Sequence, residues 1–392
     1  MKKKILFVID SLQCAGAEKS LVTLLSLLNY KKYQVDLQLF SYGGAFEEFI
    51  PKEVKILPPL EYTLFVSEKK RAPKTKNEFL YLWSRLKYSI KLRLYKKLNI
   101  TQYRLYWQSI SSCYKIQKNN YDIAIAYSQG IPTFYIIDKI NANKKIAWIN
   151  VSYNLKGKNK QYQEPYYKKL DNIVTVSSSV YNIFKQVYPQ FSNKLKLIWD
   201  INDANLINLL SNKTIPSVFK SSINILTIAR LNKEQKGYDI TLEACKILKE
   251  RNINFKWYAI GKGEYREEME QYIKNNNLKD TFIFLGTMPN PYPYLKSCTL
   301  YVQTSRYEGY GLSIAEARIL NRPVVTTEFD AVYNQMVPGK NGLVVKQDPV
   351  AVADAIENLL RDKDLYDSIV AYQQQEKKGN QEEIEKFYQL VE

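Results

Sequence analysis

Residues 300–317 read LYVQTSRYEGYGLSIAEA, and this stretch decides the fold. It begins with an apolar run, 300–304, that is typical of a buried strand, and it continues into a loop in which Gly309 and Gly311 permit a tight turn. A helix is expected from Leu312. Strand, loop and helix in this order predict a right-handed βαβ unit of a parallel sheet. Because N–H groups of the loop and the positive end of the helix point the same way, an anion site is expected there.

The same alternation of strand and helix runs through the whole chain. In the first half, strands are expected at Lys4–Ile9, Val35–Phe40, Val54–Leu57, Ile123–Tyr127, Lys145–Ile149, Ile173–Val176 and Leu195–Trp199. In the second half, they are expected at Ile223–Ala229, Phe255–Ile260, Thr281–Leu285, Leu300–Thr304, Pro323–Thr327 and Leu343–Val345. Such apolar strands predict an α/β fold of two facing, Rossmann-like, doubly wound domains, with the active site in a cleft between them.

The strands also suggest where the domains begin and end. An N-terminal domain is expected over 1–201 and a polar linker over 202–222. A C-terminal domain is expected over 223–372. The remaining residues, 373–392, are expected to form a helix that can pack back on the N-terminal domain.

Composition excludes several classes of protein. The 392 residues are 45% hydrophobic and 24% charged, which is typical of two or three globular domains. The chain has no histidine, so hydrolases and metalloenzymes that depend on His are excluded. No apolar run approaches the roughly 18 residues of a membrane span, and the apolar run that follows the N-terminal lysines is too short for a secretory signal. The four cysteines lack metal-ligand spacing and are expected to be reduced thiols of a cytoplasmic protein.

Two carboxylates and two cations can meet at the anion-binding loop. Glu308 lies in the loop, and Glu316 lies about one turn into the helix. Arg230 follows a strand and Lys236 precedes the next helix, so both can neutralise a diphosphate in the same cleft. Carboxylates accept hydrogen bonds from hydroxyl groups, which suits a sugar or ribose attached to a phosphate. The plainer interpretation is that Glu316 only favours the helix N-terminus and Glu308 is a solvated loop charge.

Together these motifs resemble the retaining glycosyltransferases of family 4, which have the GT-B architecture and include bacterial capsular and surface polysaccharide enzymes. The resemblance covers most of the C-terminal half, and its most specific element is the Glu-x7-Glu spacing of Glu308 and Glu316. Further matching motifs are Ala229-Arg230-Leu231, Lys236-Gly237, Ile260-Gly261-Lys262-Gly263, Phe284-Leu285-Gly286 and Arg322-Pro323-Val324-Val325. In the N-terminal half the resemblance is looser and rests on Gly16-Ala17-Glu18 and on Lys145–Ile149.

The resemblance implies a role for each candidate residue. Arg230 and Lys236 would hold the donor diphosphate, Glu316 the ribose hydroxyls, and Glu308 the hydroxyls of the transferred sugar. The backbone at Gly16 and Ala17 would approach the phosphate. The loop residues Gly309, Tyr310, Gly311 and Leu312 would complete the donor site. No metal and no resident cofactor are expected, because the donor is a nucleoside diphosphate sugar, expected to be UDP-linked, whose charge these groups can meet.

One position departs from the family pattern. Related enzymes often carry a histidine after the Trp-Ile pair, and this chain has Asn150 there. An amide can donate a hydrogen bond to a sugar hydroxyl, but it cannot accept a proton as a base at neutral pH. A retaining reaction, in which an oxygen of the leaving diphosphate accepts the proton of the acceptor, needs no such base. Asn150 is therefore kept as a candidate site residue.

Two other motifs are weak matches to known sites. Gly261-Lys262-Gly263 begins a GxGxxG dinucleotide pattern, but Arg266 replaces the third glycine. Asp362-Lys363-Asp364 matches the metal-binding DxD of another glycosyltransferase architecture, yet it lies among other charges after a helix. A solvated surface is the favoured interpretation of the second motif.

The net charge of +18 is concentrated between Glu68 and Lys118, where fourteen basic residues stand against two glutamates. Within 69–98, apolar residues recur every three or four positions, at Phe79, Leu82, Trp83, Leu86, Ile90, Leu94 and Leu98. A basic amphipathic helix with Trp and Tyr suits the surface of an anionic membrane. The alternatives are a helix packed on its own domain with solvated lysines, and a nucleic-acid surface. Nucleic acid is not expected as a partner, because no recognisable nucleic-acid motif accompanies the charge.

The expected function is transfer of a hexose from the nucleotide sugar to a lipid-linked saccharide acceptor in surface polysaccharide synthesis. The N-terminal domain would bind the acceptor. The protein would be cytoplasmic and peripheral at the inner face of the cell membrane. A catalytically silent nucleotide-sugar-binding paralogue and, less favoured, a nucleic-acid-binding protein are the alternatives from other classes.

Overall fold

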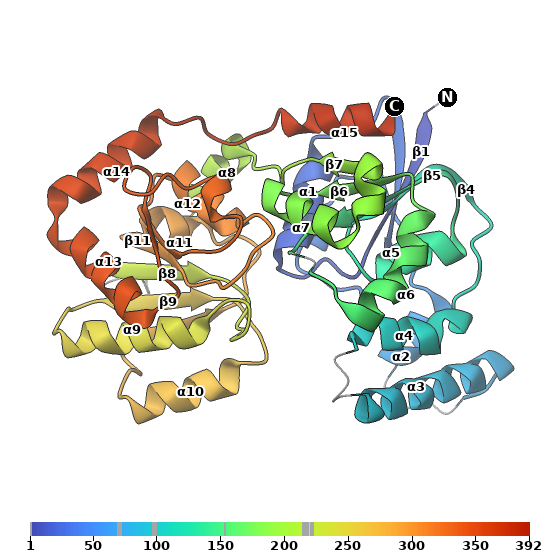
Figure 1. The fold of residues 1–392 in the computed structure, drawn as a ribbon, viewed down its shortest axis with the longest axis horizontal. Coiled ribbons are helices and arrows are strands. Elements are labelled where there is room, and N and C mark those ends of the chain that lie inside the picture. Colours follow the sequence, from blue (N-terminus) through green and yellow to red (C-terminus); the bar gives the residue numbers. More distant parts are fainter. Residues whose placement is uncertain (1, 69–72, 96–99, 153, 214–218, 220–222) are drawn as a thin grey trace. The chain divides into compact units, whose positions relative to one another are not determined.

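A computed structural model describes residues 2–392 except 69–72, 96–99, 153, 214–218 and 220–222. The chain folds into two compact units, each an α/β structure (Figure 1). The first unit comprises Met1–Gln13, Ala17–Trp199 and Ile384–Glu392. The second comprises Cys14–Gly16 and Asp200–Glu383.

Among its described residues, the first unit contains a parallel sheet of seven strands in the order β3-β2-β1-β4-β5-β6-β7. The strands are β1 (Lys3–Ile9), β2 (Tyr33–Leu39), β3 (Val54–Ile56), β4 (Asn120–Ala126), β5 (Asn141–Ile149), β6 (Asn172–Thr175) and β7 (Leu195–Leu197). Each lies where the sequence predicted a strand. The most central are buried along most of their length, which explains their continuous apolar composition.

The second unit repeats this plan. Its described residues form a parallel sheet of six strands in the order β10-β9-β8-β11-β12-β13. The strands are β8 (Asn224–Ile228), β9 (Lys256–Ile260), β10 (Phe282–Gly286), β11 (Leu300–Gln303), β12 (Val324–Thr327) and β13 (Leu343–Val345). In both sheets the strand order reverses beside the first strand, which is the Rossmann arrangement that places ligands beyond the carboxyl ends of the strands. The predicted fold class of two Rossmann-like parallel-sheet domains is confirmed.

Helices cover the sheet of the first unit. They are α1 (Gly16–Ser26), α2 (Glu61–Ser67), α3 (Lys76–Leu94), α4 (Gln102–Ile110), α5 (Ile131–Lys139), α6 (Gly157–Lys168) and α7 (Ser178–Val187), with short 3-10 turns η1 (Glu47–Phe49), η2 (Ser111–Cys113) and η3 (Pro189–Lys194). The last helix, α15 (Glu383–Val391), also packs on this sheet. Its Phe387 stacks on Phe7 with ring centroids 6.1 Å apart, and Lys3 Nζ donates to Val391 O at 3.0 Å.

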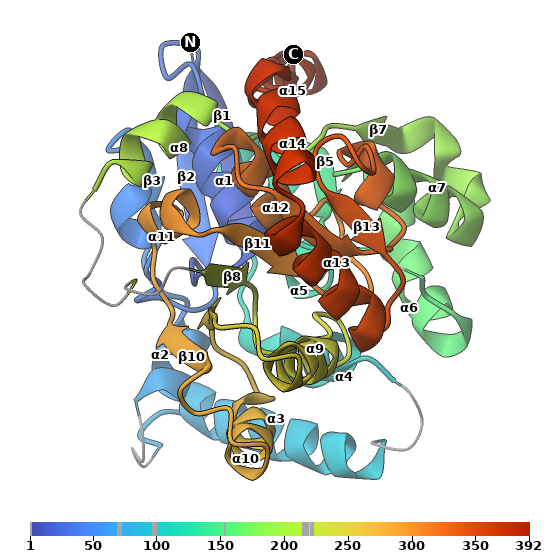
Figure 2. The same ribbon diagram turned by 90° about the vertical axis from the view of Figure 1, so that its left-hand side faces the viewer.

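Both faces of the second sheet are covered by helices, which are α8 (Ala204–Ser211), α9 (Tyr238–Glu250), α10 (Arg266–Asn275), α11 (Tyr292–Ser297), α12 (Leu312–Ile319), α13 (Pro349–Arg361) and α14 (Lys363–Gln375), with the turn η4 (Val332–Asn334). Side chains of α9, α10 and α13 pack with Trp257 and Val302 in one apolar cluster. Side chains of α11 and α12 pack with Tyr258 and Tyr301 in another. Figure 2 shows the same elements turned by 90°.

The structure differs from the predicted linker over 202–222. Helix α8 lies inside that range. Its N-terminus is capped by the Asp203 side chain, which accepts a hydrogen bond from Leu206 N at 3.0 Å. Ile207 is buried in the second unit. The polar composition of the range concealed this short helix, while 214–218 and 220–222 lie outside the described residues.

Helix α3 lies on the outside of the first unit, beyond α2 and α4 (Figures 1 and 2). Thr75 and Glu78 form a capping box at its N-terminus. Tyr81 and Ser84 are buried, and the Tyr81 hydroxyl donates to Glu61 Oε2 at 3.2 Å. The helix ends at Leu94, so Leu98 of the predicted stripe lies outside the described residues. No helix in the described ranges has the length and apolar composition that a bilayer span requires.

Candidate functional site

Two glycines allow the loops of the second unit to approach each other closely. Gly237 has φ +62°, and a Cβ atom there would lie 2.1 Å from Thr304 O. Without a Cβ atom, the start of α9 can pack against the end of β11, so only glycine is compatible with the position. Gly311 has φ +89° and turns the chain into α12. Gln335 Nε2 fixes this turn by donating to Tyr310 O at 2.6 Å and to Gly311 O at 3.2 Å.

The Glu308 carboxylate is buried at the centre of these loops. Its side-chain oxygen Oε1 accepts three hydrogen bonds, from Lys236 Nζ at 2.5 Å, Ser305 Oγ at 2.6 Å and Gln303 Nε2 at 2.9 Å. Glu308 is 6% exposed, and its ion pair with Lys236 is therefore largely removed from water. A carboxylate held in this way keeps one position, which a group that orients a ligand hydroxyl requires.

A second layer of hydrogen bonds holds Gln303 in place. The Tyr301 hydroxyl donates to Gln303 Oε1 at 2.8 Å, so the amide nitrogen of Gln303 faces Glu308. Both residues are buried, with Gln303 3% and Tyr301 0% exposed. Burial also raises the pKa of Tyr301 well above its ordinary value, which keeps the hydroxyl protonated as the donor.

The loop that carries the cations is braced by ion pairs and hydrogen bonds. Arg306 makes a bidentate ion pair with Asp239, with Nη1 to Oδ1 at 2.9 Å and Nη2 to Oδ2 at 2.7 Å. Arg306 N also donates to Gln235 O at 2.8 Å, which joins the β11 loop to the β8 loop. Arg230 Nη2 donates to Gln235 Oε1 at 3.1 Å. Arg230 and Lys236 therefore lie on one braced loop, and Lys236 is paired to Glu308.

Glu316 occupies a separate position in the first turns of α12. It is 1% exposed, and its Oε1 accepts a hydrogen bond from the Tyr292 hydroxyl at 3.3 Å. Burial and the neighbouring carboxylate raise the pKa of Tyr292 well above its ordinary value, so the hydroxyl remains a donor. The structure places Glu308 and Glu316 at opposite ends of the loop and helix that contain Gly309, Tyr310, Gly311 and Leu312. Neither carboxylate is a solvated surface charge, so the plainer interpretation of Glu308 is wrong.

The remaining sequence candidates lie elsewhere. Gly16 and Ala17 form the first turn of α1, directly after the β1 loop. Asn150 follows β5 in the first unit, and its Nδ2 donates to Tyr127 O at 2.6 Å. Its main-chain N–H donates to Gln129 Oε1 at 3.2 Å. The Oδ1 atom of Asn150 is buried and has no hydrogen-bond partner among the described residues. In this arrangement the Asn150 amide nitrogen bonds within the protein, and its oxygen is shielded from solvent.

Sequence reasoning missed the supporting residues Gln303, Ser305, Arg306, Asp239 and Tyr292. One signal was visible for Gln303, because an amide stands in an otherwise apolar strand of the kind that is buried on both faces. The partners of Arg306 and Glu316 lie 67 and 24 positions away in sequence, and no local pattern indicates them. The weak DxD match is explained structurally, because Asp362 caps α14 by accepting from Leu365 N at 2.9 Å.

Two parallel Rossmann-like sheets define the GT-B class of fold. The solved structure of Anabaena HepE in complex with UDP and glucose matches 99% of this chain and 99% of its own, with a TM-score of 0.70 and 17% sequence identity. At this identity the likeness establishes the fold alone.

The sequence comparisons match part of the chain. Residues 210–376 match the family model of glycosyl transferases group 1. An uncharacterized glycosyltransferase of Methanocaldococcus jannaschii is 29% identical over 167 residues, 42% of this chain and 41% of that protein. The poly(ribitol-phosphate) alpha-N-acetylglucosaminyltransferase of Staphylococcus aureus is 26% identical over 188 residues, 43% of this chain and 38% of that protein. The chain thus spans about two fifths of the length of these relatives. The family match covers the segment that holds Arg230, Lys236, Glu308 and Glu316.

Proposed function

We propose that this protein is a retaining glycosyltransferase that transfers a hexose from a UDP-linked sugar to a lipid-linked saccharide in surface polysaccharide synthesis. The observation that carries the proposal is the buried Glu308 carboxylate, paired with Lys236 at 2.5 Å and placed directly before the loop into α12. The family match over residues 210–376 supports the activity. HepE, which shares the fold, was solved with UDP and glucose, and this supports the choice of UDP as the nucleotide.

The groups of the second unit suit the parts of such a donor. Arg230, Lys236 and the N–H groups at the start of α12 can meet the diphosphate charge, since a helix N-terminus and fixed cations both favour anions. Glu316 lies in the first turns of that helix and can accept hydrogen bonds from ribose hydroxyls. Glu308 can accept from hydroxyls of the transferred sugar. Because these groups supply the charge complementarity, the proposed reaction is independent of a metal ion.

The proposed chemistry needs no histidine. The acceptor hydroxyl oxygen forms a bond to the anomeric carbon on the face from which UDP leaves, while the bond from that carbon to the diphosphate oxygen breaks. The proton of the acceptor hydroxyl moves to the departing diphosphate oxygen, so atoms and charge balance. Asn150 would orient a hydroxyl once its Oδ1, which is buried in this structure, is uncovered. Lys236 and Arg230 would stabilise the charge that develops on the leaving diphosphate.

The exposed face of α3 supports a membrane-held acceptor. Phe79, Trp83, Leu86, Ile90 and Leu94 form one stripe along the helix and are between 46% and 68% exposed. Arg85, Lys87, Lys91 and Arg93 lie on the same helix. Large apolar side chains exposed among cations match the interface of an anionic bilayer, where apolar burial and charge attraction add. We propose that this helix holds the protein at the cytoplasmic face of the cell membrane.

A thermal-stability screen of nucleotide sugars tests the proposal. A UDP-sugar present at 100 times its dissociation constant should add about 2.7 kcal/mol to the free energy of unfolding. We expect stabilisation by UDP and by at least one UDP-hexose, followed by release of UDP when that hexose donor is incubated with the protein. Absence of stabilisation by every UDP-sugar would remove the donor site from the second unit. Stabilisation without release of UDP under any condition would favour a catalytically silent binding protein.

A further inference from the structure

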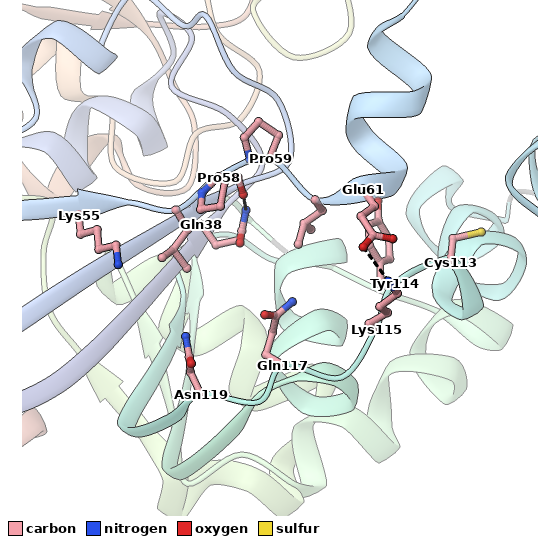
Figure 3. A pocket seen from close by; sticks show the side chains of 12 residues that line it. Gln38, Lys55, Pro58, Pro59, Glu61, Cys113, Tyr114, Lys115, Gln117 and Asn119 are labelled. Atoms are coloured by element: carbon pink, nitrogen blue, oxygen red, sulfur yellow. Dashed lines mark hydrogen bonds and ion pairs between the residues drawn. The ribbon is translucent and has the colours of Figure 1, made fainter. Parts of the chain in front are cut away.

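A cavity of about 350 Å³ lies in the first unit, at the outer edge of its sheet. Figure 3 shows that one wall comes from β2, β3 and the segment 57–61 that follows β3. The opposite wall comes from residues 113–119, which lead from η2 to β4. The volume lies in the usual range for small-molecule sites, which is about 300–1,000 Å³. None of its lining residues belongs to the donor-site groups of the second unit.

Gln38 on β2 gives this cavity a fixed hydrogen-bond acceptor. The residue is only 3% exposed although it lines the cavity. Its Nε2 donates to Leu39 O and to the Tyr42 hydroxyl, both at 3.0 Å, and to Pro58 O at 3.5 Å. The Tyr42 hydroxyl in turn donates to Leu57 O at 2.7 Å. Because the amide nitrogen is committed to the protein, Oε1 is the atom of Gln38 that can accept from a ligand.

The opposite wall repeats this arrangement. Gln117 Nε2 donates to the Tyr135 hydroxyl at 3.2 Å, which leaves its Oε1 as a second acceptor at the cavity. Asn119 adds an amide with both donor and acceptor atoms. Glu61 and Lys115 form an ion pair of 2.6 Å between the two walls, drawn as a dashed line in Figure 3. The charges of this pair balance each other, and Lys55 adds one cation to a lining that otherwise offers the neutral amides of Gln38, Gln117 and Asn119.

The apolar part of the wall is rigid before any ligand binds. Pro58 and Pro59 each have a fixed φ angle, and Leu57 and Leu60 flank them. A rigid apolar surface beside fixed amide acceptors matches a molecule that has hydroxyl groups on its edge and C–H groups on its face. Hydroxyl groups can donate to Gln38 and Gln117 and accept from Asn119 at the same time. Pyranose rings have this chemistry, whereas a phosphate can pair with Lys55 but lacks the donors that the two glutamine oxygens require.

We propose that this cavity binds a saccharide unit through its hydroxyl groups, as a site separate from the donor site. The origin of this saccharide rests on the proposed function, because the saccharide acceptor would supply such units. The binding itself is inferred from the cavity alone. Glu61 also accepts from the Tyr81 hydroxyl of α3, so the cavity wall is joined directly to the proposed membrane-binding helix. A saccharide that enters from a lipid carrier would meet this cavity beside the helix that binds the membrane.

Saturation-transfer NMR with simple glycosides tests the site. The probes are the methyl α-glycosides of glucose, galactose and N-acetylglucosamine, added to the full-length protein in the presence of saturating UDP. The site variant is Asn119→Trp, which places an indole at an exposed lining position and so fills the cavity without disturbing the core. The matched control is Ile116→Trp, because Ile116 is 67% exposed on the same segment but does not line the cavity.

We expect at least one glycoside to bind the wild type and the Ile116→Trp control with equal affinity. The dissociation constant of that glycoside should rise at least tenfold in Asn119→Trp, while UDP affinity stays the same in all three proteins. Failure of every glycoside to bind the wild type, or equal binding by Asn119→Trp, would overturn the proposal. Failure of the proposed function would be seen separately, because calorimetry would then detect no binding of UDP to the wild type.

A second measurement identifies the source of the saccharide. The glycoside that binds is incubated with the protein and a UDP-hexose, and the product is analysed by mass spectrometry. If the bound glycoside represents a unit of the acceptor, it should gain the mass of one hexose. If it represents a free effector, it should be recovered unchanged, and it should change the rate of UDP release in the wild type but not in Asn119→Trp. If the glycoside is neither extended nor alters UDP release, the cavity has no part in the reaction and its saccharide role is rejected.

Discussion

Replacing Gln303 by leucine removes one of the three hydrogen bonds to Glu308 Oε1 while keeping a side chain of similar size in a buried position. The lost bond is 2.9 Å long and joins a neutral donor to a carboxylate that is 6% exposed. Hydrogen bonds to charged groups contribute about 1.5–3 kcal/mol, which corresponds to roughly a 10- to 150-fold change in rate. Lys236 and Ser305 remain as donors, so we expect kcat to fall within this range and not to vanish.

The assay is steady-state release of UDP from the preferred UDP-hexose, with UDP affinity measured by calorimetry. Because Glu308 is proposed to contact the transferred sugar and not UDP, the affinity for UDP should not change in Gln303→Leu. Tyr301→Phe removes the hydroxyl that orients Gln303 and that also donates to Ile228 O at 3.4 Å, and both of these bonds are neutral, so its kcat should fall about 2- to 10-fold. Thermal unfolding shows whether both variants remain folded. A kcat within twofold of the wild type for Gln303→Leu, or a loss of UDP affinity as large as the loss of kcat, would refute this reasoning.

Four further predictions follow from the described contacts. Lys236→Ala and Glu316→Ala should each weaken UDP binding by roughly 10- to 150-fold, as measured by calorimetry, and unchanged affinity in both would remove these residues from the donor site. Transfer should persist in EDTA, so activity that EDTA abolishes and Mg²⁺ or Mn²⁺ restores would contradict the proposed metal independence. The protein should sediment with anionic vesicles but hardly with neutral ones, and high salt should weaken the association. The variant in which Gln replaces Lys87, Lys91, Arg93, Lys96 and Lys97 should no longer sediment with anionic vesicles. Equal sedimentation of wild type and variant would reject membrane binding by this segment. Burial lowers the pKa of Lys378 to about 8, and Arg318 acts in the same direction. Because the folded state loses this proton before the unfolded state does, the free energy of unfolding should rise between about pH 8 and 10.4. An NMR titration midpoint of the Lys378 ε-methylene near 10.4 would contradict this.

The strands could be predicted from the sequence because they depend on local composition. Each predicted run is short, apolar and rich in β-branched or aromatic residues, and the parallel order follows from the intervening helices. Helix α8 was missed because a cap at Asp203 and two buried residues, Ile207 and Ser211, stabilise it within a polar stretch. Its packing partners lie in distant parts of the chain, and no local pattern reveals them.

The candidate site was predictable in its motif residues and not in their partners. The spacing of Glu308 and Glu316 and the position of Lys236 mark the loops that hold them. The hydrogen bonds from Gln303 and Ser305 depend on side-chain directions at the end of β11, which spacing does not specify. The same limit applies to α3, whose apolar stripe was visible in the sequence. Only the structure shows that Trp83 and its neighbours on the stripe are exposed and not part of a core.

The central claim is that this chain transfers a hexose from a UDP-sugar with retention of configuration at the anomeric carbon. The most direct measurement is time-resolved proton NMR of UDP-α-glucose, UDP-α-galactose and UDP-α-N-acetylglucosamine incubated with the protein, in which water serves as the acceptor. For the preferred donor, we predict release of UDP together with the α-anomer of the free sugar before mutarotation produces the β-anomer. Initial formation of the β-anomer, or no release of UDP from any donor, would contradict the account.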